Sequence, residues 1–222
     1  MKKNFLKVTF ATDKNSWILP YLKKFVAQIK PKIKKVDLVF KSKDIKKGDL
    51  AFFLSFQEIV RQNILNKNTN NLVVHHSPLP KGKGMSPLSW QILEGKNSIP
   101  ITLFEAVSEL DAGKIYLQKE VNFDGTELLE DLRKIQSKYT FLLCEEFIER
   151  YPSVLEEAKD QKGKESFYKR RTPVDSELNI NKSILDQINL LRIVDNVRFP
   201  AFFNYKGQKY NLKIFKSPKS NE

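Results

Sequence analysis

Asn71-Leu-Val-Val-His-His-Ser-Pro-Leu-Pro-Lys-Gly-Lys-Gly84, followed by Ser86-Pro-Leu-Ser-Trp90 and Leu110-Asp-Ala-Gly-Lys-Ile-Tyr-Leu-Gln118, is the part of the sequence that decides the fold. An apolar run ends at His75, and Pro, Lys and Gly follow at once, which is typical of a buried strand that ends at the rim of a sheet. Asp111 stands in a turn before another predicted strand. A histidine and a carboxylate on two such rims can converge and move a proton near neutral pH.

The composition predicts a protein of the cytoplasm with no membrane span. The 222 residues suffice for one domain, or for one domain with a small appendage. Cys144 is the single cysteine, which suits a reducing compartment, and the start of the chain lacks an apolar segment of signal-peptide length. The net charge of +13 favours anionic partners such as nucleotides, polyglutamate tails or nucleic acid, but scattered surface lysines would explain it equally well.

Strands and helices alternate in the first half of the chain, which predicts a doubly wound, mostly parallel α/β sheet. Such sheets bind ligands at the carboxyl ends of their strands. No Gly-x-Gly-x-x-Gly follows the first strand, so a dinucleotide-binding fingerprint is absent. The expected elements are strands at Phe5–Thr12, Val36–Phe40 and Leu50–Leu54, a helix at Trp17–Ile29, a helix opened by Ser55 and running through Leu65, and a polar loop at Asn66–Asn71.

The second half predicts two more strands, a long amphipathic helix and a small appendage. Its expected elements are a helix at Pro87–Glu94 stopped by Gly95, strands at Ile99–Ala106 and Lys114–Phe123, a long helix capped by Thr126, a helix at Lys182–Val194, and a β-hairpin within 199–215. We therefore expect a main domain at 1–151, a linker or arm at 152–176, and a helix-plus-hairpin subdomain at 177–222. Phe202, Phe203 and Tyr205 in the hairpin fit either a small core or a stacking surface for a base.

The quoted stretch resembles the folate-dependent N-formyltransferases, in particular the catalytic core of the methionyl-tRNA formyltransferase type. The matching positions are His75, Ser77, Leu79-Pro80, Lys83-Gly84, Pro87, Trp90 and Asp111-Ala-Gly113. The resemblance implies a Rossmann-like fold and transfer of a formyl group from N10-formyltetrahydrofolate to an amine. It implies that His75 binds the oxyanion or acts as a base, and that Asp111 relays the proton. The sequence departs from the family at Val73, where the family has an asparagine, and Asn71 lies about 6–7 Å further back along the strand.

The resemblance also implies ligand-binding residues. The segment after the third strand would hold the pterin, which assigns folate contacts to Ser55, Phe56, Gln57 and Ile59, although Phe56 and Ile59 also fit a plain core. Contacts to the acceptor fall on Ser77, Lys81 and Lys83, where lysine charges and glycine-exposed backbone N–H groups suit a phosphate. No metal site is expected, because two adjacent histidines and one distant cysteine do not form one.

The acceptor is predicted from the C-terminal quarter of the chain. Arg170-Arg-Thr-Pro-Val-Asp-Ser176 resembles a segment of the sugar-modifying branch, and the length leaves no room for the C-terminal barrel of methionyl-tRNA formyltransferases. The predicted acceptor is the amine of a UDP- or dTDP-linked deoxyamino sugar used for bacterial surface glycans. The alternatives are a catalytically silent formyltransferase-like binding protein and a glycinamide ribonucleotide-type enzyme. A nucleic-acid partner is not expected, because RNP, KH and double-strand-binding signatures are absent. A homodimer is left open.

Overall fold

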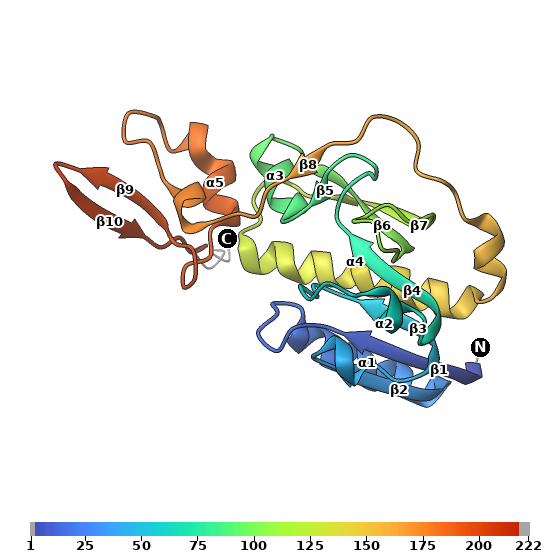
Figure 1. Cartoon of the computed structure of the whole chain (residues 1–222). Helices are drawn as coiled ribbons and strands as arrows, with labels where there is room; N and C mark the ends of the chain where they lie inside the picture. Colours follow the sequence, from blue (N-terminus) through green and yellow to red (C-terminus); the bar gives the residue numbers. More distant parts are fainter. Residues whose placement is uncertain (1–2, 218–222) are drawn as a thin grey trace, which may run out of the picture.

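Six strands form the central sheet of the computed structural model, which describes residues 3–217, in the order β2-β1-β3-β4-β6-β7 (Figure 1). The first four strands of this order run parallel, and β6 and β7 are antiparallel to their neighbours. The mostly parallel sheet that the sequence predicted is therefore confirmed. The strands are β1 (Lys3–Ala11), β2 (Ile33–Val39), β3 (Gly48–Phe53), β4 (Asn68–His75), β6 (Ser98–Glu105) and β7 (Ile115–Asn122).

Helices cover the two faces of the sheet unequally. The long helices α1 (Leu19–Ile29) and α4 (Leu129–Arg150) pack against one face, where the larger hydrophobic core lies. The short helix α2 (Gln62–Leu65) and loop segments cover the other face with a smaller core that includes Phe53 and Val73. The connection from β1 to β2 thus runs over one face and the connection from β3 to β4 over the other, which is the predicted doubly wound arrangement. The chain segments that leave β1 and β3 diverge at the carboxyl edge, where open α/β sheets bind ligands.

Two predicted boundaries between β3 and β4 are wrong. The helix expected from Ser55 is limited to α2, and β4 already begins at Asn68 inside the expected polar loop. Ser55 adopts φ 48°, a left-handed conformation in which a right-handed helix does not start. Asn71 donates from Nδ2 to the Leu65 carbonyl at 2.9 Å, so this polar strand residue binds the carboxyl end of helix α2.

The long helix also begins later than the sequence predicts. Thr126 is not its cap, because the hydroxyl and the backbone N–H of Thr126 both donate to Asp124. The Glu127 carboxylate accepts the backbone N–H groups of Asp124 and Gly125, which holds this segment in a turn. The backbone N–H of Leu128 donates to the Asp131 carboxylate, and the helix starts at the next residue, Leu129.

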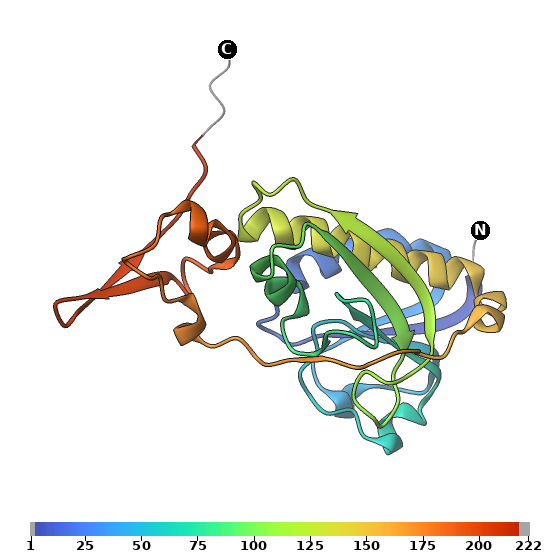
Figure 2. The same cartoon turned by 90° about the horizontal axis from the view of Figure 1, so that it is seen from above.

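The polar arm at 152–176 lies against the main domain along much of its length (Figure 2). Lys159 bridges to Ile115, and β8 (Phe167–Tyr168) pairs in parallel with β5 (Lys83–Gly84). The short helix α3 (Pro87–Leu93) presents Trp90, whose indole N–H donates to the Lys169 carbonyl at 2.7 Å and whose ring stacks with Tyr168. The arm thus covers the basic loop that follows His75.

The C-terminal part forms a small helix and a hairpin that projects from the main domain (Figure 1). The predicted helix is shorter than expected: α5 spans Ile188–Ile193 after a 3-10 turn. The hairpin of β9 (Ala201–Tyr205) and β10 (Gln208–Leu212) is present as predicted. Phe202 is buried and Phe203 stacks on Tyr210, so both rings are engaged within the hairpin. Arg192, 2% exposed, anchors this part by an ion pair to Glu127 at 3.0 Å.

Across the described residues 3–217, no helix has the length and hydrophobicity that a bilayer crossing requires.

Candidate functional site

His75 and Asp111 meet beside the end of β4. The His75 Nδ1 lies 4.0 Å from the Asp111 Oδ2, and each side chain is 10% exposed. The convergence predicted from the sequence is confirmed as geometry. Both groups are largely withdrawn from water, and a low local dielectric strengthens the interaction between a protonated imidazole and a carboxylate.

Asp111 reaches His75 by a route that differs from the expected one. Because β6 runs antiparallel to β4, its last residue Glu105 pairs with Leu72 instead of lying at the carboxyl edge. The loop after β6 must therefore fold back along the sheet to bring Asp111 to His75. Gly113 makes this return possible, because a Cβ at that position would overlap the Glu105 carbonyl oxygen. Asp111 itself adopts φ 51°, and the Gly84 N–H donates to its Oδ2 at 2.9 Å.

The hydrogen bonds of His75 fix its tautomer. Nε2 lies 2.8 Å from the Gly82 carbonyl oxygen, and a carbonyl can only accept, so the neutral ring carries its proton on Nε2. The unprotonated Nδ1 then faces the Asp111 carboxylate. A proton bound at Nδ1 would lie between the imidazole ring and this carboxylate.

His76 occupies the opposite face of the strand and is packed. Gln136 on α4 lies 3.0 Å from its Nδ1, and the Thr140 hydroxyl lies 3.1 Å from its Nε2. The Gln136 amide can only donate from nitrogen, so His76 accepts at Nδ1 and donates from Nε2. Burial, aided by the neighbouring His75, lowers the pKa of His76 to about 3. His76 is therefore a neutral structural residue near neutral pH.

Val73 shares a strand face with His75 and packs with the smaller core. Asn71, the nearest upstream asparagine, is buried and its amide nitrogen is committed to the Leu65 carbonyl. It does not take the place of the asparagine that the resemblance expects at position 73. Neither side chain therefore offers an amide N–H beside His75.

The residues predicted to hold a pterin lie in an irregular loop after β3. The ring centroid of Phe56 lies 5.9 Å from that of Phe53, whereas Ile59 is 86% exposed and does not belong to the core. Gln57 joins this loop to two other segments: its N–H donates to Asp13 at 3.4 Å, and its side chain accepts from Arg170 of the arm at 3.1 Å. Within the described chain the backbone of residues 58–60 makes no hydrogen bond, so these peptide groups are available to a ligand.

The residues predicted to bind the acceptor are placed differently from one another. Lys81 is exposed in the loop after β4. Lys83 is 2% exposed, and its ammonium pairs with Glu165 of the arm, so its charge is already compensated. Ser77 is fully buried beside His76, and its hydroxyl has no hydrogen-bond partner among the described residues.

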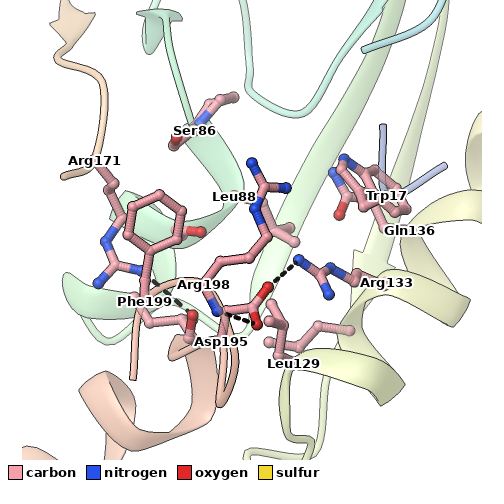
Figure 3. A pocket seen from close by; sticks show the side chains of 14 residues that line it. Trp17, Ser86, Leu88, Leu129, Arg133, Gln136, Arg171, Asp195, Arg198 and Phe199 are labelled. Carbon is pink, nitrogen blue, oxygen red and sulfur yellow. Dashed lines mark hydrogen bonds and ion pairs between the residues drawn. The ribbon is translucent and has the colours of Figure 1, made fainter. Parts of the chain in front are cut away.

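A cavity that the sequence analysis did not foresee lies beside α4 and the C-terminal part, with a volume of about 230 Å³ (Figure 3). His75 and Asp111 do not line it. Its charged residues are Arg133, Arg171, Arg198 and Asp195. The one available sequence signal was the Arg-Arg-x-Pro segment that contains Arg171. The other members come from segments too far apart in the sequence to be linked by any local pattern. We call this space the arginine cavity.

The comparisons with known proteins agree with the fold. The model of the formyl transferase family matches residues 23–152. The methionyl-tRNA formyltransferase of Malacoplasma penetrans is 24% identical over 153 residues, which are 67% of this chain and 46% of that protein. The chain spans about half the length of such relatives.

Solved structures extend the similarity to the whole chain. A methionyl-tRNA formyltransferase from Clostridium thermocellum superposes with a TM-score of 0.77 at 19% identity, covering 98% of this chain and 96% of that one. A 4-N formyltransferase from Francisella tularensis gives 0.69 at 17% identity, with 96% and 98% covered. HypX from Aquifex aeolicus in complex with tetrahydrofolic acid gives a TM-score of 0.73 at 15% identity, covering 94% of this chain and 37% of that one. Because the Clostridium chain is matched almost end to end, length does not separate the acceptor classes.

Proposed function

The chain belongs to the formyl transferase family, and from this premise we propose that it transfers a formyl group from N10-formyltetrahydrofolate to the amino group of a nucleotide-linked deoxyamino sugar. The observation that carries the proposal is the His75–Asp111 pair. His75 is held through Nε2 by the Gly82 carbonyl, and its Nδ1 faces the carboxylate at 4.0 Å. A pair held in this way can accept a proton and stabilise the resulting charge.

The proposed reaction exchanges one carbon–nitrogen bond for another. The amine nitrogen of the acceptor attacks the formyl carbon of the donor, and the bond from that carbon to N10 breaks. The amine loses one proton and N10 gains one, so the products are the formamide and tetrahydrofolate. We propose that His75 takes the amine proton at Nδ1 and that Asp111 stabilises the imidazolium. General acid–base assistance of this kind contributes about 10²–10⁴-fold.

The oxyanion that forms during the attack needs a donor other than residue 73. Removal of one oxyanion donor costs about 10²–10³-fold in other enzymes. In this chain we propose that a protonated His75 supplies the hydrogen bond, since the backbone N–H groups of residues 82–84 already donate to Ser166 and Asp111. The departure at Val73 also supports a second possibility, a silent relative that binds folate or nucleotide without turnover.

The loop after β3 supports the folate part of the proposal. Its backbone groups at 58–60 are unpaired and Ile59 is open to solvent, which suits a ring held by peptide groups on one side and by an apolar side chain on the other. The chain contributes binding and orientation here, while the donor supplies the formyl group. We propose Ser55, Phe56, Gln57 and Ile59 as its contacts.

The acceptor is the part of the proposal that most needs a direct test. The Arg-Arg-x-Pro segment and the hairpin support an amino sugar linked to UDP or dTDP, in a bacterial glycan pathway. The net charge of +13 and the similarity to methionyl-tRNA formyltransferases support a second acceptor, the amino group of an aminoacyl-tRNA.

A panel of acceptors tests both candidates in one assay. The protein is incubated with N10-formyltetrahydrofolate and, separately, UDP- and dTDP-linked amino sugars, glycinamide ribonucleotide and methionyl-tRNA, and products are identified by mass spectrometry. We expect a formamide on one of the nucleotide-linked sugars. A product on methionyl-tRNA alone would select the second candidate. Folate binding without any product would support the silent relative and overturn the proposed activity.

A further inference from the structure

The arginine cavity carries charge and shape that the His75–Asp111 pair does not use. Three arginines and one aspartate line it, so positive charge exceeds negative by two (Figure 3). Its walls come from five distant parts of the chain: the segment just before α1, the segment that opens α3, the first turns of α4, the arm at Arg171, and the end of α5 with the turn that follows it. Such a convergence of basic side chains in a concave site suits an anionic ligand.

Asp195 does not cancel the positive charge of the whole cavity, because its carboxylate is already engaged by two backbone N–H groups and by Arg133. Burial would raise its pKa, but the backbone N–H groups of Arg198 and Val197 and the guanidinium of Arg133 outweigh burial and hold the pKa below its usual range. The Arg133–Asp195 ion pair spans 2.9 Å. Arg133 is thereby compensated, and Arg171 and Arg198 keep their charge for a ligand.

Arg171 is partly buried and only partly satisfied. It donates to the Ile193 and Asp175 carbonyls at 3.3 and 3.0 Å and to the Ser176 hydroxyl at 3.2 Å. Its Nε is buried and has no partner among the described residues. Since an unpaired buried N–H is costly, a ligand oxygen near it would satisfy a real deficit.

Arg198 is exposed and extends over the cavity beside Leu88 (Figure 3). Among the described residues its guanidinium makes a cation–π contact of 5.8 Å to Phe199 and no ion pair. An arginine guanidinium presents donors in a planar fork that matches two phosphate oxygens at once. Arg198 is therefore the residue in this cavity most suited to a phosphate.

Apolar and dipolar features narrow the class of anion. Trp17 and Phe199 supply aromatic faces at the cavity, which suit a base or a ribose better than they suit an inorganic ion. Leu129 and Leu132 bring the first turns of the 22-residue helix α4 to the wall, and the amino end of a helix carries partial positive charge.

We infer that the arginine cavity binds the diphosphate of a nucleoside diphosphate through Arg171 and Arg198. The inference rests on the proposed function, because it takes this nucleotide to be the one that is linked to the acceptor sugar. The place in the fold supports the link. Gln136 lines the cavity and hydrogen-bonds His76, the residue next to His75. The cavity therefore adjoins the α4 side of the strand end whose other face carries His75.

Calorimetric titration of the full chain with UDP, dTDP and uridine tests the inference without any turnover. We expect UDP or dTDP to bind, and uridine to bind at least about tenfold more weakly, because uridine lacks the phosphates that would accept charge-assisted hydrogen bonds from the arginines. Arg198→Ala should weaken diphosphate binding by about tenfold or more. Arg198→Lys should fall between, since it keeps the charge and loses the planar fork.

Lys24→Ala provides the matched control, since it removes one positive charge from an exposed position of α1, outside the cavity. It should leave UDP and dTDP affinity within about twofold of the original chain. Binding of tetrahydrofolate, measured on the same Arg198→Ala sample, should be unchanged and shows that this variant is folded.

The outcomes separate this inference from the proposed function. The chain could bind the diphosphate, lose this binding in Arg198→Ala, and yet formylate no amino sugar. That result would support the diphosphate site in the cavity and overturn the proposed reaction. Equal diphosphate affinity of Arg198→Ala and the original chain would overturn the cavity, whatever the activity. A CCA-ended RNA that binds in an Arg198-dependent way, while UDP and dTDP do not bind, would also overturn the assignment of a nucleoside diphosphate.

Discussion

His75 and His76 are neighbours of the same residue type at the end of one strand, yet the structure gives them opposite chemistry. His75 faces a carboxylate at 4.0 Å and gives its other nitrogen to a backbone carbonyl. His76 faces α4, where an amide and a hydroxyl satisfy both of its nitrogens. The comparison teaches that the side of the sheet, and not the residue type, decides which histidine can exchange a proton. We propose a role in proton transfer for the first and a role in stability for the second.

The largest expected effect is on the rate, at His75. Glutamine at this position keeps an N–H that can reach the Gly82 carbonyl but cannot take up a proton. We expect His75→Gln to lower kcat by about 10²–10⁴-fold, with a midpoint of thermal unfolding close to that of the original chain. Steady-state formyl transfer and a thermal melt on the same sample measure both.

The partner of His75 sharpens this prediction. Because Asp111 is proposed to act through the imidazolium, the double variant His75→Gln/Asp111→Asn should be little slower than His75→Gln alone. If the rate loss of the double variant equals the product of the two single losses, the residues act independently. That result would contradict the proposal that Asp111 acts through His75.

The next effect is on stability, at His76. Replacement by glutamine disturbs two buried hydrogen bonds, so His76→Gln should lower the free energy of unfolding by about 1–3 kcal/mol. The kcat should change less than about tenfold. Urea denaturation measures the first and formyl transfer the second. A rate loss as large as that of His75→Gln would contradict the proposal that only the histidine on the Asp111 side of the strand transfers a proton.

The pH dependence of stability follows from the same residue. The folded-state pKa of His76 is lowered to about 3, below its ordinary value of 6.5, so the unfolded chain binds more protons between these values. His76 therefore removes stability as the pH falls from about 6.5 toward 3, by roughly 1.4 kcal/mol per pH unit at most. His76→Gln should show a shallower loss over this window. An unchanged slope would mean that the histidine is charged in the folded state.

The smallest expected effect is at Val73, on the same face as His75. Asparagine here would place an amide among apolar neighbours of the smaller core, which costs about 1–3 kcal/mol of stability. We expect Val73→Asn to bring no gain in kcat, because we propose that another group donates to the oxyanion. A gain of about 10²-fold would instead identify a missing oxyanion donor.

The sequence predicted those features that depend on local pattern. The apolar run before His75 and the Asp-Ala-Gly turn indicated two groups that meet, and they do meet. The path of Asp111 was not predictable, because the antiparallel direction of β6 depends on pairing with β4 and leaves no trace in either strand. The polar residues Asn68–Asn71 suggested a loop, but pairing with β3 made them a strand. Local polarity yields to backbone pairing in such cases.

The arginine cavity marks the limit of sequence analysis in this chain. Trp17, Ser86, Gln136 and Arg198 share no motif, and only the packing of the C-terminal part against α3 and α4 brings them together. The charge of Arg198 was visible in the sequence. Its freedom from an acidic partner was not, since that depends on Asp195 being engaged by Arg133.

Transfer of carbon-13-labelled formyl from N10-formyltetrahydrofolate, followed by NMR for the original chain, His75→Gln and His76→Gln side by side, tests the central claim most directly. The account predicts a labelled formamide on a UDP- or dTDP-linked amino sugar with the original chain and with His76→Gln, and almost none with His75→Gln. Label transfer that His75→Gln supports as fast as the original chain, or that no nucleotide-linked sugar accepts, would contradict it.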